Sequence, residues 1–76
     1  MNGNGGYQIL RQIGLRIKQL RTDKVLSQQD LAQLCGISKS GMSRIEAGQI
    51  NMSMRTLLCI VEAFGISMVE FFDGLD

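Results

Sequence analysis

Four serines, each followed by a short amphipathic segment, constrain the fold of this chain more than any other feature. Each stands where a hydroxyl accepts a backbone N–H at the start of a helix. They are Ser27, Ser38, Ser53 and Ser67. An apolar residue precedes each serine and another follows four positions after it, which is the spacing of a hydrophobic staple. The pairs are Leu26 with Leu31, Ile37 with Met42, Met52 with Leu57, and Ile66 with Phe71.

Glycines mark where these helices end. Gly36, Gly48 and Gly65 stand at the expected stops. Before the first serine, apolar residues recur at 3-4-3 spacing and make the buried stripe of a further helix. They are Leu10, Ile13, Ile17 and Leu20. No segment has a strand pattern, so the sequence predicts an all-α fold of five helices, near residues 8–22, 28–35, 39–47, 54–64 and 68–73.

Length and composition indicate a small single-domain protein. The 76 residues suffice for one small domain, expected over 7–76, and the glycine-rich segment 1–6 is expected to be a disordered tail. Cys35 and Cys59 fall within helical patterns and read as small core residues. Without histidine or a CxxC motif, neither a metal site nor a cofactor is expected. The chain has no secretory leader and no membrane-length apolar run, so we expect a cytoplasmic protein.

Charge is unevenly distributed along the chain. All eight basic residues lie at or before Arg55, where three acidic residues oppose them and leave a net charge of +5. Four acidic residues and no basic ones follow Arg55. A basic front part and an acidic tail suggest two surfaces with different partners.

Residues 28–47 read as two short helices joined by a tight turn. Ala32 is small where two such helices would cross most closely, and Gly36 can take a positive φ in the turn. Met42 and Ile45, at i and i+3, would anchor the second helix. Its outer face is polar and basic with no acidic residue, and it carries Lys39, Ser40, Ser43 and Arg44.

At these residues the chain resembles the phage-repressor and Cro type (XRE-type) family of helix-turn-helix DNA-binding domains, over roughly residues 9–72. Segment 27–32 matches the start of the motif, 36–38 its turn, and 43–48 the end of its recognition helix. In size and form the chain also resembles the small controller proteins of restriction–modification systems. The resemblance implies a compact lambda-repressor-like domain that binds double-stranded DNA and regulates transcription, with no small-molecule ligand.

The resemblance also implies which residues contact DNA. Base contacts are expected from Lys39, Ser40, Ser43 and Arg44, because side chains near the start of a recognition helix reach base edges. Gln28 is expected to meet the DNA backbone and to brace the recognition helix. Further backbone contacts or electrostatic attraction are expected from Gln49, Asn51, Arg16, Lys18 and Arg55. Arg21 and Glu46 are expected to form an internal ion pair.

Two positions depart from the family pattern. Val25 stands where a glycine commonly closes the first helix. Because a β-branched residue resists positive φ, we expect loop 22–26 to take another path. Gly41 lies inside the recognition helix, where it either removes a DNA-contacting side chain or lets the backbone approach DNA closely.

The C-terminal third has more apolar residues than one small domain needs. One stripe is expected to pack on the other helices, and it comprises Leu57, Ile60, Val61, Phe64 and Phe71. The remainder has no evident partner and is expected to form a homodimer interface, from Leu58, Met68, Val69, Phe72 and Leu75. A two-fold dimer would bind a palindrome with half-sites about one DNA turn apart.

Other functions remain open at this point. The chain has no activated-nucleophile arrangement and no phosphate-binding glycine loop, so an enzyme is not expected. A protein-interaction module with the same fold is one alternative, and an antitoxin that binds both DNA and a protein partner is another. The basic face around Arg44 favours DNA over either.

Overall fold

The computed structural model describes residues 5–75, and within this range the chain forms five helices and no strand. They are α1 (Gly5–Asp23), α2 (Gln28–Cys35), α3 (Lys39–Glu46), α4 (Met54–Phe64) and α5 (Met68–Asp73). The all-α prediction is confirmed, and the bounds of α2 to α5 agree with the sequence pattern to within one residue. In the same range, no helix combines the length and apolar character needed to cross a membrane.

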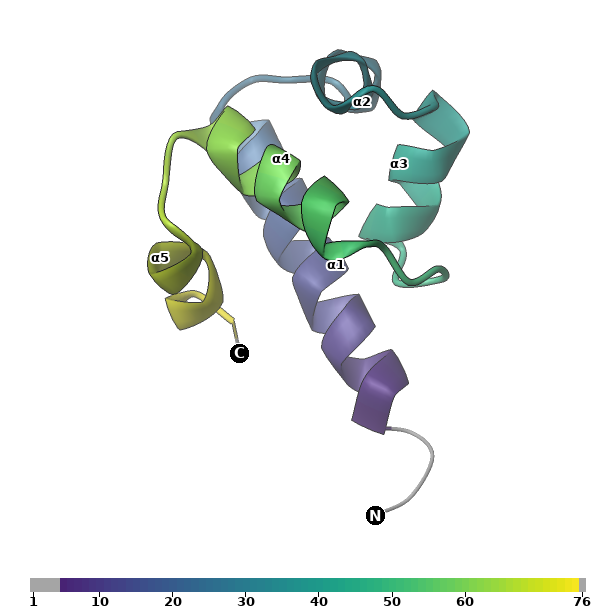
Figure 1. The fold of residues 1–76 in the computed structure, drawn as a ribbon, viewed down its shortest axis with the longest axis vertical. Helices are drawn as coiled ribbons and strands as arrows, with labels where there is room; N and C mark the ends of the chain where they lie inside the picture. The colour runs from purple at the N-terminus through teal and green to yellow at the C-terminus, as the bar shows by residue number, and fades with distance from the viewer. Residues whose placement is uncertain (1–4, 76) are drawn as a thin grey trace.

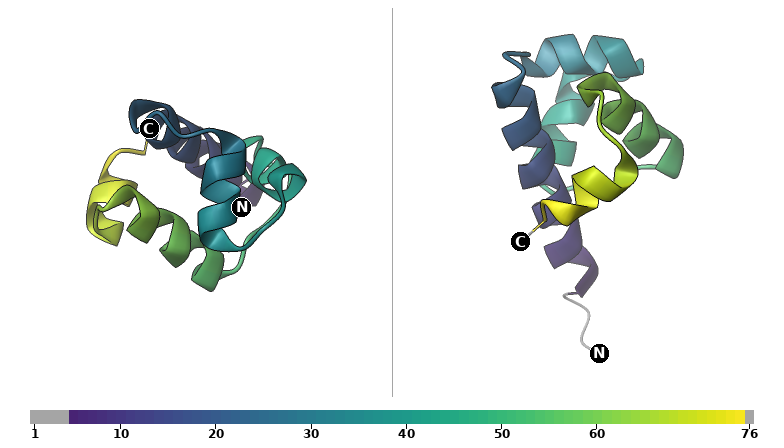
Figure 2. Two further views of the ribbon diagram at one scale, coloured as in Figure 1. Left: turned by 90° about the horizontal axis from the view of Figure 1, so that it is seen from above. Right: turned by 90° about the vertical axis from the view of Figure 1, so that its left-hand side faces the viewer.

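α2 packs mainly against α3 and α4, while α3 and α4 also pack against the long α1. The N-terminal turns of α1 project beyond the other helices (Figure 1). Two further views show α5 below α4 and beside α1 (Figure 2). Each of the helices α1 to α4 contributes several side chains to one core, and α5 contributes Phe71. The stripe predicted on α4 is part of this core. Its buried members are Ile13, Ile17, Leu31, Ala32, Met42, Ile45, Leu57, Ile60, Val61, Phe64 and Phe71.

The four predicted serines cap the N-termini of α2 to α5. Every predicted serine accepts a backbone N–H from the third residue of its helix. Ser27 with Asp30 and Ser67 with Glu70 form complete capping boxes. In the first of these, the Ser27 backbone N–H donates to the Asp30 carboxylate at 3.0 Å and lowers the pKa of Asp30.

Helix α1 begins earlier than expected. Gly5 and Gly6 belong to α1, whereas the sequence analysis assigned them to a disordered segment. A helix already held by tertiary packing extends at its end at little cost, because each added residue brings one hydrogen bond without a new nucleation step. Residues 1–4 of the expected tail lie outside the described range.

The prediction for the loop after α1 is wrong. Val25 adopts φ 59°, the left-handed conformation that its β-branched side chain was expected to prevent. Three hydrogen bonds compensate the strain. The Val25 N–H donates to Thr22 O and the Leu26 N–H to Arg21 O, both at 3.0 Å, as in a Schellman motif. The Arg21 guanidinium also donates to Leu26 O at 2.8 Å.

Glycines let α1 approach the end of α3. A Cβ on Gly14 would lie 2.6 Å from Ile45 O and 2.5 Å from Glu46 O, so only glycine fits between the two helices. This close approach explains why α1 tolerates a residue that weakens helices. Gly48, at φ 71°, turns the chain after α3 so closely onto α1 that its Cβ would lie 2.7 Å from Arg11 Cα.

Candidate nucleic-acid interface

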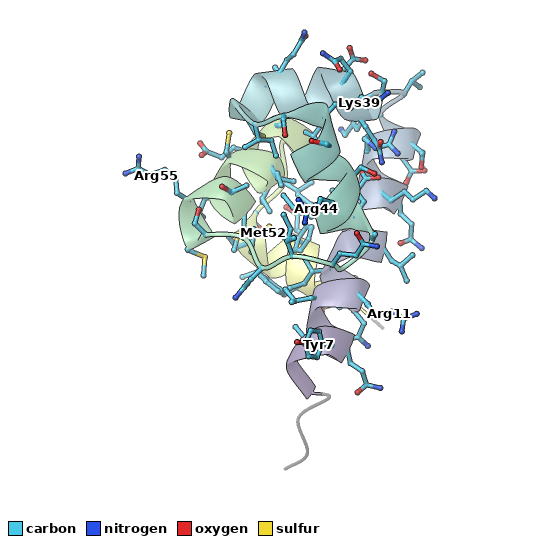
Figure 3. All side chains as sticks on the ribbon, turned by 90° about the vertical axis from the view of Figure 1, so that its right-hand side faces the viewer. Tyr7, Arg11, Lys39, Arg44, Met52 and Arg55 are labelled. Atoms are coloured by element: carbon cyan, nitrogen blue, oxygen red, sulfur yellow. The ribbon has the colours of Figure 1, made fainter. Side chains whose placement is uncertain are left out.

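α3 has one buried and one exposed face. Met42, Ile45 and Glu46 are buried. The opposite face is formed by the four predicted base-contacting residues, all exposed: Lys39, Ser40, Ser43 and Arg44. Figure 3 looks onto this side of the molecule, with Lys39 near the start of α3 and Arg44 further along it. The structure therefore places the predicted base contacts together on a single accessible helix face.

No uncompensated carboxylate lies on α3. Its one acidic residue, Glu46, is 6% exposed. The Arg21 guanidinium donates to it twice, from Nε to Oε2 at 2.6 Å and from Nη2 to Oε1 at 3.1 Å. The ion pair implied by the family resemblance is thus present. Because Arg21 neutralises Glu46 inside the protein, Lys39 and Arg44 set the charge of the exposed face.

The same carboxylate joins three helices. Gln28, the first residue of α2, donates from Nε2 to Glu46 Oε1 at 3.0 Å. Glu46 therefore links α1 through Arg21 and α2 through Gln28 to the end of α3. This network fixes the orientation of α3, which is the bracing role expected of Gln28. Its expected contact with the DNA backbone stays a prediction.

The start of α3 is organised by Ser38. Its Oγ accepts the Gly41 N–H at 2.9 Å and lies 3.2 Å from Ser40 Oγ. Gly41 has no left-handed backbone angle, so the turn geometry does not require glycine there. A Cβ at this position would lie 3.0 Å from Ser38 Oγ. Glycine at position 41 therefore leaves room for the capping hydroxyl.

The predicted backbone contacts divide into two groups. Lys18, Gln49, Asn51 and Arg55 are exposed and remain candidates. Gln49 and Asn51 line an open concavity of about 350 Å³, which is completed by Gly6, Tyr7 and Leu10. It lies where the loop after α3 meets the start of α1.

Arg16 is half-buried and forms hydrogen bonds with α5. Its Nε donates to Phe71 O at 3.1 Å, its Nη2 donates to Glu70 O at 3.2 Å, and the guanidinium lies 6.0 Å from the centroid of the Phe71 ring. Arg16 therefore donates to two carbonyl groups near the end of α5, and Phe71 O also accepts the Gly74 N–H at 3.3 Å. These bonds use two of the five N–H donors of the guanidinium. The expected contribution of Arg16 to DNA binding stays a prediction.

The C-terminal apolar surface is smaller than predicted. Leu58, Val69 and Phe72 are exposed, and 42%, 78% and 39% of their surfaces are accessible. Met68 and Leu75, however, are partly buried against the core. They already have partners within the domain because α5 folds back beside α1 and α4. The candidate dimer face is thus Leu58, Val69 and Phe72.

Two residues beside the interface escaped the sequence analysis. Tyr7 and Arg11 lie next to the loop after α3 because α1 begins early and packs against Gly48. Their spacing contained the signal, since positions 7, 11, 14 and 18 share one face of a helix and Gly14 contacts α3.

The fold and this face define a helix-turn-helix DNA-binding domain of the repressor type. The family model described as a helix-turn-helix domain matches residues 12–71, and the chain belongs to that family. This confirms the resemblance seen in the sequence.

Solved structures show the same architecture. The restriction-modification controller protein C.AhdI from Aeromonas hydrophila is 38% identical, with a TM-score of 0.80 over 86% of this chain and 98% of that protein. The controller protein C.Esp1396I, crystallised as a tetramer with its natural 35 base-pair operator, is 29% identical, with a TM-score of 0.77 over 86% of both chains.

Curated relatives are longer proteins. The transcriptional regulator PuuR of Escherichia coli strain K12 is 34% identical over 59 residues, which cover 78% of this chain. The chain spans about a third of that regulator's length (32%). The similarity to PuuR therefore concerns the helix-turn-helix domain.

Proposed function

We propose that this protein is a sequence-specific transcriptional regulator that binds a palindromic operator as a homodimer and catalyses no reaction. The exposed face of α3 is the observation that carries the proposal. It presents Lys39 and Arg44 without an opposing carboxylate, on a helix held in place by the Arg21–Glu46–Gln28 network. Such a face suits the major groove, where bases offer hydrogen-bond acceptors next to phosphates.

Each residue of the face has a proposed role. The Arg44 guanidinium can donate to guanine O6 and N7 together, and Lys39 can donate to the same atoms or to a phosphate. Ser40 and Ser43 have shorter side chains, and their hydroxyl groups hydrogen-bond to the bases that lie closest to α3. Gln28 places an amide at the N-terminus of α2, where free N–H groups favour a phosphate.

Dimerisation is proposed through the exposed apolar side chains of α4 and α5. Leu58, Val69 and Phe72 provide the apolar centre that stable interfaces need. A two-fold axis through this face would repeat α3 on one side of the DNA. The operator would then contain two inverted half-sites about one helical turn apart.

Selection of binding sites from a random duplex pool, at about physiological salt, tests this function. An enriched palindrome is the expected result. An enriched single half-site would retain DNA recognition and overturn the dimer. No enrichment by the folded protein would overturn the regulator and favour the alternative, a protein-interaction module or antitoxin acting through the face that contains Phe72.

A further inference from the structure

The N-terminal turns of α1 lie beside the proposed DNA-binding face. Gly48 packs directly on Arg11, so the loop that follows α3 rests against this end of α1. The concavity of about 350 Å³ lies at this junction and is lined by Gly6, Tyr7, Leu10, Gln49 and Asn51. Two segments that are distant in sequence therefore build one surface.

The chemistry of this surface suits an anion. Tyr7 has a phenol hydroxyl, Gln49 and Asn51 have amide donors, and none of the lining residues is acidic. Arg11 lines an adjacent concavity with Gln8, Gln12 and Leu15, and its backbone lies against Gly48. Its guanidinium is exposed, and no hydrogen bond or ion pair is present for it within residues 5–75. Neutral donors in one concavity and a cation beside it can together hold neighbouring phosphate oxygens.

The location of the surface indicates which anion it binds. In Figure 3, Tyr7 and Arg11 lie on the side that presents Lys39 and Arg44, beyond the C-terminal end of α3. When a helix enters the major groove, the elements at its ends meet the phosphate backbones that border the groove. A donor-rich surface at the end of α3 is therefore suited to the backbone flanking the bases that α3 reads.

We propose that Tyr7 and Arg11, together with Gln49 and Asn51, form a second contact site for the phosphodiester backbone of DNA. The proposal rests on the proposed function and extends it, because it gives the first turns of α1 a direct part in DNA binding. The site binds phosphate without reading bases. It therefore raises the affinity for all sequences alike and leaves the preference among them unchanged.

Measuring the affinity for a short mixed-sequence duplex against salt concentration tests the proposal. Each lost phosphate contact makes the negative slope of log K against log salt shallower by about 0.9. Arg11→Ala should show this loss and bind about five-fold more weakly near physiological salt. Arg11→Lys retains the charge and should keep most of the slope. Gln19→Glu changes the net charge by the same amount on an exposed part of α1 away from this surface, and it is the matched control.

Three outcomes are distinguishable. A loss of slope with Arg11→Ala that is absent with Gln19→Glu supports the second site. Equal effects of the two variants, or none, overturn it and leave the proposed function intact. Failure of the folded wild-type protein to bind any duplex overturns both. Ethylation of individual phosphates then checks the location, since interference outside the half-site should disappear in Arg11→Ala.

Discussion

At the scale of single residues, Val25 has a backbone conformation that its β-branched side chain disfavours. It is the one non-glycine residue with positive φ in the described range, and 88% of its surface is accessible. The left-handed conformation costs an L-residue about 1 kcal/mol or more. We expect Val25→Gly to raise the free energy of unfolding by about 0.5–1 kcal/mol, after the entropy that glycine adds to the unfolded chain. Urea denaturation measures this, with Val25→Ala as the control that keeps Cβ. A loss of stability in Val25→Gly would contradict the strain.

Glu46 is the residue on which the position of α3 depends. Glu46→Gln removes the charge but keeps the shape, so the buried Arg21 guanidinium would lose its counter-ion. Uncompensated buried charge is costly, and we expect a loss of about 3 kcal/mol in the free energy of unfolding. Thermal and urea denaturation measure it. Glu62→Gln, at an exposed site on α4, is the control. An unchanged midpoint would show that the pair contributes nothing to stability.

At the scale of helices, α5 is held by the buried Phe71 and by hydrogen bonds from one arginine of α1. Arg16 donates to Phe71 O and Glu70 O, and the chain at Gly74 passes so close to its guanidinium that a side chain there would collide with it. We expect Arg16→Ala to loosen α5, because a six-residue helix is not stable alone. Hydrogen exchange should accelerate at the amides of residues 71–75 and stay unchanged in α2 and α3. Exchange that is unaltered in α5 would show that Phe71 holds this helix without help.

The exposed face of α3 supports a prediction about specificity. Arg44 is exposed on α3 and can contact a guanine through two hydrogen bonds. We expect Arg44→Ala to lose about 1–3 kcal/mol of discrimination at one base pair and to keep binding elsewhere. Comparing the two proteins over all single-base changes of the selected site measures this. An identical profile for both would remove Arg44 from base recognition.

Local chemistry explains why the helices could be predicted. Each serine, its staple pair and the following glycine act within a few residues, so Ser27, Gly36 and their counterparts define helix ends without tertiary information. Contacts between segments that are distant in the sequence are harder to predict from the sequence. The basic character of Arg16 favours DNA, and only the packing of α5 beside α1 shows that two of its N–H donors bond within the protein. Met68 and Leu75 were assigned to an interface for the same reason, since the fold-back of α5 cannot be deduced from apolar periodicity.

At the scale of the whole molecule, the core and the proposed dimer face contain different apolar side chains. Phe71 belongs to the core, whereas its neighbour Phe72 and the more exposed Val69 face outward. Val69 is 78% exposed within the monomer, so a charged residue there costs little in folding. In a dimer the same charge would lose its hydration without a partner. Val69→Glu therefore separates the two processes.

We expect Val69→Glu to retain the wild-type melting behaviour and to weaken dimerisation by at least about tenfold, equivalent to about 1.4 kcal/mol. Sedimentation equilibrium measures the association, and Gln33→Glu adds the same charge at an exposed site on α2 as the control. Operator binding by Val69→Glu should require higher protein concentration and resemble binding to one half-site. If Val69→Glu and Gln33→Glu associate equally well, the dimer uses another surface. The acidic C-terminal third would then need a different partner to cover Leu58 and Phe72.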